Sequence, residues 1–251
     1  QFPLLYLGDR LKHNHKLQQL LMAFAEQFSI PYATSWFAKG LFDEYHKLCL
    51  GSYNGVFTQT SGRHYIEQKV DYIIDVASSI LPQDSNIAFA TGTHKIETFE
   101  NKTLLKGGTL LEKDLVEIFQ LLLQRNKKAF SFNPPSVEPQ KIQHELDFNN
   151  LASTLNYIQA ESKTKFVYLP EVGNSYFASY SLKVKASSLG RSWLTNPWYG
   201  AMGTALPYAR VVAQRLQDNA LDERAVVIIG DGGFHFQLND LIHFLKETLK
   251  I

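Results

Sequence analysis

A carboxylate lies inside a glycine-rich turn in the stretch VVIIGDGGFHFQLNDL, residues 226–241. Asp231 stands between Gly230 and Gly232, directly after an apolar run of the kind that forms a buried strand. Glycine turns after strands commonly cradle phosphate groups through backbone amides, and a carboxylate repels a phosphate. The position of Asp231 therefore requires either a counter-charge or a purely structural explanation.

The dinucleotide-binding fingerprint GxGxxG does not fit this turn, because its third glycine position is occupied by His235. A divalent cation between carboxylate and phosphate removes the conflict of charge, since Mg²⁺ binds carboxylates together with phosphate oxygens. The residues thus favour Asp231 as a Mg²⁺ ligand that bridges to a diphosphate. The amides of Gly232 and Gly233 would donate to the remaining oxygens. A tight turn that needs glycine for backbone reasons alone is the alternative.

Strands alternate with helices along the chain, which predicts parallel sheets covered by helices. We expect an α/β fold of two doubly wound parallel-sheet domains, the second one incomplete. The expected domains are residues 1–130, a proline-rich linker at 131–143 around FNPPSVEPQ, and residues 144–251. Strands are expected at PLLYLG, SIPYATS, 72–76, FVYLP and AVVIIG, and helices near 17–28, 63–70, 115–123, 144–160, 203–216 and 238–250.

Ligands of doubly wound sheets bind at the carboxyl ends of the strands. Two loops of the second domain lie at such ends, EVGNSYF (171–177) and GDGGF (230–234). Glu171 opens the first of these loops, and a structural polar contact at the strand end is the expected role for it. His235 and His243 are expected on the helix after the second loop, in packing or surface roles.

The composition is that of a water-soluble globular protein, with 45% hydrophobic and 20% charged residues. A formal net charge of +1 gives no reason to expect a nucleic acid or an anionic membrane as partner. The single cysteine, Cys49, cannot form an internal disulfide, which favours a cytoplasmic location. The chain begins with a strand-like segment and ends within a helical pattern, so we expect no signal peptide and expect the chain to be part of a longer polypeptide.

Several motifs together resemble the thiamine diphosphate-dependent enzymes. GDGGF after a strand is similar to the first half of their metal and diphosphate motif, and NPWYGAMGTALPYA to the segment that holds the aminopyrimidine ring. EVGNSYF resembles the loop that closes over the diphosphate. FAKGLFDEYHKLCLGSYNG and ILPQDSNIAFATG are similar to the central domain of the pyruvate and indolepyruvate decarboxylase branch.

The resemblance implies a role for four residues at the diphosphate end of the cofactor. Asp231 would bind Mg²⁺, and Gly232 and Gly233 would donate their amides to the diphosphate. Asn174 occupies the position at which these decarboxylases often carry a hydroxyl residue in contact with the diphosphate. An amide can make a similar contact.

Two further residues are implied at the pyrimidine end. Gly200 would offer its carbonyl to the 4′-amino group, and Met202 would be the apolar wedge that bends the cofactor into its V shape. Considered alone, Met202 is more typical of a core gap-filler, and Gly200 is compatible with a small residue before a helix.

The implied function is that of a fragment of a thiamine diphosphate- and Mg²⁺-dependent, non-oxidative 2-oxo acid decarboxylase of the pyruvate, phenylpyruvate or indolepyruvate type. In that family a glutamate from the N-terminal domain of a neighbouring subunit activates the pyrimidine, which implies a homodimer or homotetramer. No catalytic residue is therefore assigned within the chain. An acetolactate synthase-like carboligase, or a non-catalytic relative that serves as a binding or regulatory module, are the alternatives.

Overall fold

The computed structural model of the chain describes residues 2–58, 60–79, 94–99, 102–104, 110–111, 113–125, 129–133, 150–196, 199–247 and 249. The chain divides into two compact units, one of Gln1–Lys39 and His46–Val137 and the other of Gly40–Tyr45 and Glu138–Ile251. Most of the expected linker, the start of the helix expected near 144 and the stretch ILPQDSNIAFATG lie outside the described residues.

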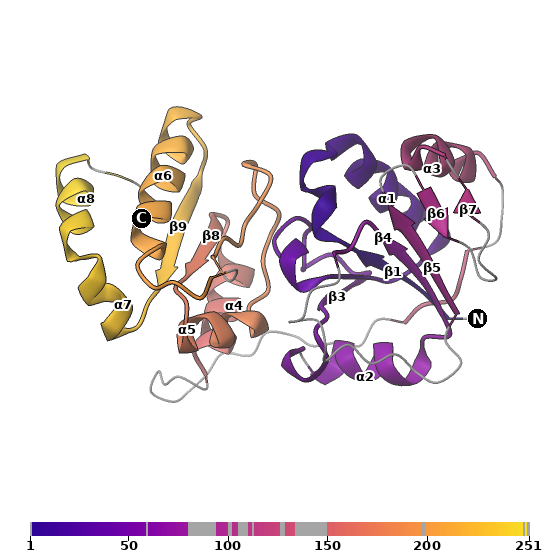
Figure 1. Cartoon of the computed structure of the whole chain (residues 1–251), viewed down its shortest axis with the longest axis horizontal. Coiled ribbons are helices and arrows are strands. Elements are labelled where there is room, and N and C mark those ends of the chain that lie inside the picture. Colours follow the sequence, from indigo (N-terminus) through magenta and orange to yellow (C-terminus); the bar gives the residue numbers. More distant parts are fainter. Residues whose placement is uncertain are drawn as a thin grey trace. The chain divides into compact units, whose positions relative to one another are not determined.

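The first unit is built on a seven-stranded sheet with the order β3-β2-β1-β4-β5-β6-β7 (Figure 1). The strands from β3 to β5 pair in parallel, whereas β6 and β7 add an antiparallel edge. The expected parallel α/β architecture is confirmed, but β3 and the antiparallel edge were not predicted. The strands are β1 Pro3–Leu7, β2 Tyr32–Thr34, β3 Cys49–Ser52, β4 Tyr72–Val76, β5 His94–Phe99, β6 Lys102–Leu104 and β7 Leu110–Leu111.

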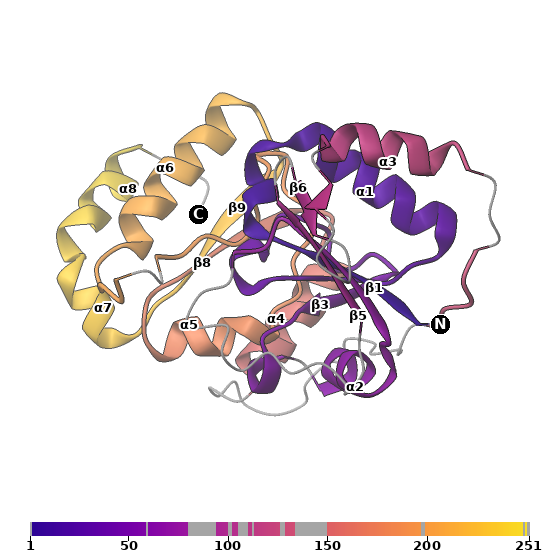
Figure 2. The same cartoon turned by 45° about the vertical axis from the view of Figure 1, so that its right-hand side comes forward.

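Helices cover both faces of this sheet. Figures 1 and 2 show α1 and α3 on one face and α2 on the other. The helices are α1 His15–Phe28, α2 Thr60–Lys69 and α3 Leu115–Leu123, with short 3-10 turns η1 Asp9–His13, η2 Trp36–Ala38 and η3 Gly55–Phe57.

Helix α1 shows how local sequence sets these elements. It begins where the side chain of Asn14 accepts a hydrogen bond from the backbone of Leu17 at 3.0 Å. It ends at Ser29, which adopts a left-handed φ of 52°. The apolar face of α1 is buried, and its Phe24 ring packs edge-on against Phe119 of α3, with 5.3 Å between ring centroids. The helical spacing of apolar residues thus places α1 and α3 on the same face of the sheet.

The opposite face has its own buried cluster. Ile66 of α2 packs with Leu4 and Tyr6 of β1 and Ile73 of β4. Side chains alternate along a strand, so the buried Leu5 between them points to the face covered by α1. Strand β1 is therefore apolar on both sides, as expected for a central strand of a doubly wound sheet.

The second unit contains two parallel strands among its described residues, β8 Lys165–Pro170 and β9 Glu223–Ile228. They pair from Lys165 opposite Glu223 to Pro170 opposite Ile228. The other elements are α4 Leu151–Glu161, α5 Asn174–Ala178, η5 Ser179–Ser181, α6 Ala205–Asp218, α7 Asp231–Phe236, η6 Leu238–Asp240 and α8 Leu241–Glu247.

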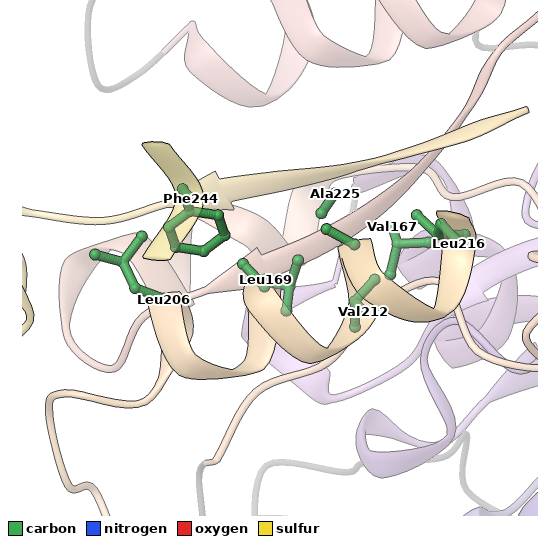
Figure 3. Close-up of a cluster of buried hydrophobic side chains, with 9 residues drawn as sticks. Val167, Leu169, Leu206, Val212, Leu216, Ala225 and Phe244 are labelled. Atoms are coloured by element: carbon green, nitrogen blue, oxygen red, sulfur yellow. The ribbon is translucent and has the colours of Figure 1, made fainter. Parts of the chain in front are cut away.

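Helix α6 lies along β8 and β9 and closes the core of the second unit (Figure 3). Its inward side chains recur at helical spacing, and Ala209 and Ala213 are fully buried, which lets the helix approach the strands closely. The buried cluster consists of Val167, Leu169, Leu206, Ala209, Val212, Ala213, Leu216, Ala225 and Phe244. This packing holds the carboxyl ends of the two strands in fixed register.

A short segment from the first half of the chain, Gly40–Tyr45, belongs to the second unit. The carbonyl of Gly40 accepts a hydrogen bond from the amide of Ser192 at 2.9 Å, and the amide of Glu44 donates to the carbonyl of Val184 at 2.8 Å. The phenol of Tyr45 donates to the carbonyl of Asn156 at 2.9 Å. The expected domain ranges, 1–130 and 144–251, place this segment in the first domain.

Among the residues that the structure describes, no helix has the length and apolar character that a membrane crossing requires.

Candidate functional site

The expected site loops begin at one edge of the second unit. Strands β8 and β9 are parallel neighbours, so their carboxyl ends share an edge of the sheet. The pairing continues beyond the strands, because the amide of Glu171 donates to the carbonyl of Ile228 at 2.8 Å. A side chain added at Gly230 would place its Cβ 4.0 Å from the hydroxyl of Ser175. The turn after β9 therefore lies against the start of α5.

The GDGG turn forms the beginning of α7. Gly230 caps the helix in an extended conformation, and its carbonyl accepts a hydrogen bond from the amide of Phe234 at 2.9 Å. Asp231 is the first helical residue, and its side chain is exposed. No heavy atom lies within 4 Å of the position that a Cβ would take at Gly232. The turn thus presents a carboxylate and open backbone side by side.

Gly233 has the opposite surroundings and is buried. A Cβ at Gly233 would stand 2.8 Å from Cγ of Glu171 and 3.3 Å from Cγ1 of Ile229. The absence of a side chain at this position lets α7 pack directly on the Glu171 side chain.

Asn174 is the first residue of α5 and is exposed. Gly173 before it has a φ of 109°, a conformation that residues with a side chain rarely adopt. Glycine at position 173 therefore allows the chain to turn sharply from β8 into α5. Asn174 and Asp231 each start a helix that follows one of the two paired strands.

The segment before α6 supplies the third loop. Gly200 and Gly203 have φ values of 60° and 98°, so both positions favour glycine. Tyr199 is 90% exposed and Met202 is 51% exposed. Met202 is therefore not part of the core, and the alternative role of a buried gap-filler does not hold for it. A Cβ at Gly203 would lie 3.8 Å from Cβ of Phe236, which places this loop beside α7.

Glu171 connects the three loops. Its side chain is 1% exposed, and one carboxylate oxygen accepts hydrogen bonds from the amides of Gly203, Thr204 and Ala205 at 3.2, 3.0 and 3.1 Å. The same oxygen accepts a hydrogen bond from the side-chain amide of Gln237. The expected structural polar contact of Glu171 is thus present, but it is an extended network and not a single contact.

Hydrogen bonding decides the charge of Glu171. Burial alone would raise the pKa of the carboxyl group, but hydrogen bonds from the backbone of Ala205 and Val172, the side chain of Gln237 and the backbone of Thr204 hold the pKa below its usual value. The group is therefore a buried carboxylate at neutral pH, and its charge is compensated by donors.

This pKa predicts how acid affects stability. A carboxyl group with a lowered pKa stabilises the fold at pH values above its unfolded pKa of about 4.3, and loses this effect as the pH falls through the folded value. We expect Glu171→Gln to lower the free energy of unfolding by about 1–3 kcal/mol at neutral pH, because buried donors lose a charged acceptor. Urea unfolding of the unmodified protein and of Glu171→Gln should show that the difference in their free energies of unfolding becomes smaller as the pH is lowered. A difference that stays constant down to about pH 3 would contradict the assignment.

Gln237 was not singled out from the sequence. It is 2% exposed and lies between α7 and η6, where it separates two short helices. His235 and His243 were expected on one helix after the turn, but they lie on α7 and α8. Both histidines are exposed, in agreement with a surface role. The sequence indicated this network only through a carboxylate directly after a buried strand. That feature identified Glu171 but not Gln237.

The described residues supply one carboxylate for a hard divalent cation, together with open backbone for a diphosphate. Within the part of the chain that the structure describes, no group of three or more His, Cys, Asp or Glu side chains could hold a metal ion. Asp231 would therefore share the cation with phosphate oxygens and with ligands from outside this group, as is usual for Mg²⁺. The open backbone at Gly232 and the exposed start of α5 at Asn174 leave room for an anion beside it.

Comparison with known proteins agrees with this geometry. Residues 1–101 match the family described as thiamine pyrophosphate enzyme, central domain, and residues 171–251 match the family described as thiamine pyrophosphate enzyme, C-terminal TPP binding domain. No protein with a curated description matches the sequence.

Among solved structures, the chain is similar to the X-ray structure of a protein from Mycobacterium smegmatis, provisionally described as a thiamin diphosphate-dependent enzyme. The TM-score is 0.64 and the sequence identity 16%, with 99% of this chain and 49% of that chain covered. This likeness establishes the fold, and the chain spans about half the length of that protein. The chain therefore carries a central domain and a C-terminal TPP-binding domain of the thiamine pyrophosphate enzymes.

Proposed function

We propose that the second unit binds thiamine diphosphate through Mg²⁺ at Asp231, and that the protein is a non-oxidative 2-oxo acid decarboxylase. The observation that carries this proposal is the exposed carboxylate of Asp231 at the start of α7, beside the open backbone of Gly232. The match of residues 171–251 to a TPP-binding domain supports the identity of the ligand.

The diphosphate end would be held by the two helix starts. Asp231 would bind the cation that neutralises the diphosphate, and the amides of Gly232 and Gly233 would donate to its oxygens. Asn174 would add a side-chain amide from the start of α5. Both helices begin shortly after the ends of β8 and β9, and backbone amides at a helix start can donate to an anion.

The pyrimidine end would be held by the loop before α6. Gly200, which has a left-handed φ, would offer its carbonyl to the amino group of the pyrimidine, and the exposed Met202 would supply an apolar contact. When bound, thiamine diphosphate supplies a carbon nucleophile and an electron sink for the release of CO₂ from a 2-oxo acid. The chain's own residues would position the cofactor and exclude water from it.

The decarboxylase assignment rests on the segment FAKGLFDEYHKLCLGSYNG, which is similar to the pyruvate and indolepyruvate decarboxylase branch. The test is release of CO₂ from pyruvate, phenylpyruvate and indolepyruvate by the intact protein, with Mg²⁺ and thiamine diphosphate. We expect aldehyde and CO₂ in equal amounts from at least one of these acids. Formation of acetolactate from pyruvate would identify a carboligase instead, and cofactor binding without turnover would identify a non-catalytic relative.

We also propose that a second copy of the protein covers this site. The elements that form the site carry exposed apolar side chains, with Tyr199 90%, Phe236 73%, Met202 51% and Phe177 50% exposed. Such a group of exposed apolar residues is typical of a binding surface. Light scattering on the intact protein should report a dimer or tetramer, and a monomer at micromolar concentration would contradict the proposal.

Met202→Ala is expected to separate catalysis from stability. Because Met202 is half exposed within its own chain, the free energy of unfolding of the single chain should change by no more than about 0.5 kcal/mol, as for most surface substitutions. Turnover by the intact protein should fall by about tenfold or more, because a misplaced cofactor loses its productive geometry. Val211→Ala on α6, where the side chain is 58% exposed, is the matched control and should leave turnover unchanged. Equal activity of the two variants would reject the wedge role of Met202.

A further inference from the structure

Four consecutive amides at the start of α6 are satisfied by side chains from elsewhere. Helix starts usually leave such amides for a cap residue of their own. The side chain of Thr204 at the cap position makes no capping hydrogen bond. Instead, Glu171 accepts from the amides of residues 203–205, and Gln237 accepts from the amide of Leu206 at 2.6 Å.

Gln237 also connects this helix start to the GDGG turn. Its side-chain amide donates to the carboxylate of Glu171 and to the carbonyl of Gly233 at 2.9 Å. Each polar atom of the Gln237 side chain thus has a partner, and the side chain is 2% exposed. A buried amide with complete hydrogen bonding has one preferred position, which fixes the groups bonded to it.

The pair therefore joins three segments that are distant in the sequence. Glu171 follows β8, Gly203 precedes α6, and Gln237 follows α7. The amide of Val172 donates to the second carboxylate oxygen of Glu171 at 2.9 Å, which fixes the side chain to its own loop. Gly233 packs on the aliphatic part of Glu171, because a Cβ there would stand 2.8 Å from Cγ.

The start of α6 is consequently already occupied by an anion, the carboxylate of Glu171. A ligand phosphate bound as proposed would therefore contact the starts of α5 and α7, and the loop that ends at Gly203 would contact another part of the ligand. The network thus sets the distance between the loop that carries Met202 and the turn that carries Asp231. Glu171 itself is too deeply buried to touch a ligand.

We propose that Glu171 and Gln237 form a positioning clamp that fixes the spacing between the two ends of the cofactor site. This inference rests on the proposed binding of thiamine diphosphate. A clamp of this kind affects a ligand that spans both ends and has little effect on a ligand that occupies only the diphosphate end. This difference separates positioning from a general contribution to stability.

The experiment compares two ligands with the intact protein by calorimetry, thiamine diphosphate with Mg²⁺ and inorganic pyrophosphate with Mg²⁺. Glu171→Gln should weaken thiamine diphosphate binding by about tenfold or more, the equivalent of one lost charged hydrogen bond. Pyrophosphate affinity should change by less than about threefold, because the register of β8 and β9 remains intact.

Glu223→Gln is the matched control. Glu223 is a buried carboxylate at the other end of β9, where it accepts hydrogen bonds from the hydroxyl of Ser187 at 2.6 Å and the amide of Ser188 at 2.8 Å. Its substitution removes a comparable network far along the strand, so both affinities should stay unchanged in the folded variant. Gln237→Met leaves the carboxylate of Glu171 in place and should also weaken thiamine diphosphate binding while pyrophosphate binding stays nearly unchanged. This second variant tests the clamp if Glu171→Gln does not fold.

Equal affinities for thiamine diphosphate in the folded variants and the unmodified protein would overturn the clamp. An equal loss of both ligands would also overturn it, because the effect would then be a general one. If the unmodified protein binds neither ligand, the proposed function fails, and the clamp fails with it.

Discussion

Asp231→Ala is expected to abolish Mg²⁺-dependent binding of thiamine diphosphate to the intact protein. Asp231 is the acidic residue in the first turn of α7, and the substitution removes the carboxylate that would attract the cation. Loss of a direct metal ligand should weaken binding by about 100-fold or more, since even indirect ligand partners contribute 10–100-fold. Calorimetric titration with and without Mg²⁺ measures the effect.

The fold should not depend on Asp231. The side chain is exposed, so the free energy of unfolding should change by no more than about 0.5 kcal/mol. Asp231→Asn keeps the shape and loses the charge, and its affinity should lie between those of Asp231→Ala and the unmodified protein. Asp222→Ala, an exposed carboxylate at the opposite end of β9, is the matched control and should bind normally. If Asp231→Ala still bound thiamine diphosphate tightly and in a Mg²⁺-dependent way, Asp231 would not be the metal ligand and the glycine turn would have a purely structural role.

Gly233→Ala is expected to lower the free energy of unfolding. The new Cβ would stand 2.8 Å from Cγ of Glu171 and 3.3 Å from Cγ1 of Ile229. Glu171 cannot move aside without breaking its hydrogen bonds to the start of α6. Overpacking of a rigid site typically costs about 1–3 kcal/mol, and urea unfolding should show a loss in that range.

Gly232→Ala provides the control for this substitution. It lies in the same helix, one residue earlier, and no heavy atom is within 4 Å of its added Cβ. Alanine is favoured over glycine in a helix by about 1 kcal/mol, so this variant should be as stable as the unmodified protein or slightly more stable. If Gly233→Ala were equally stable, the packing of α7 against Glu171 would be wrong.

Much of the fold could be predicted because its core elements carry strong periodic patterns. The strand expected at 72–76 is β4, and the apolar spacing from Leu17 to Phe28 gave the helix α1. Strand β3 was missed because it is short and contains Gly51 at a φ of 87°, which interrupts any alternation. Its pairing with β2 is also irregular between Tyr32 and Thr34.

The antiparallel edge and the division into units depend on tertiary contacts. Strands β6 and β7 are three and two residues long, too short for a pattern to be recognised. Gly40–Tyr45 joins the second unit through backbone hydrogen bonds to residues far along the chain, which composition does not indicate. The expected domain boundaries at 130 and 144 remain a prediction.

The site could be predicted as far as its residues lie in local motifs. The glycine turn placed Asp231 at a strand end and a helix start, and the structure has it there. The hydrogen bond between Glu171 and Gln237 joins residues 66 positions apart, so no local pattern reveals it. The assigned ligand roles remain predictions for all six site residues, Asn174, Gly200, Met202, Asp231, Gly232 and Gly233.

The most direct test of the account is a calorimetric titration of the intact protein with thiamine diphosphate, in the presence of Mg²⁺ and again with the cation removed by a chelator. The account predicts saturable binding at one site per chain that depends on Mg²⁺ and is lost in Asp231→Ala. Binding of the same strength without a divalent cation, or no binding in its presence, would contradict it.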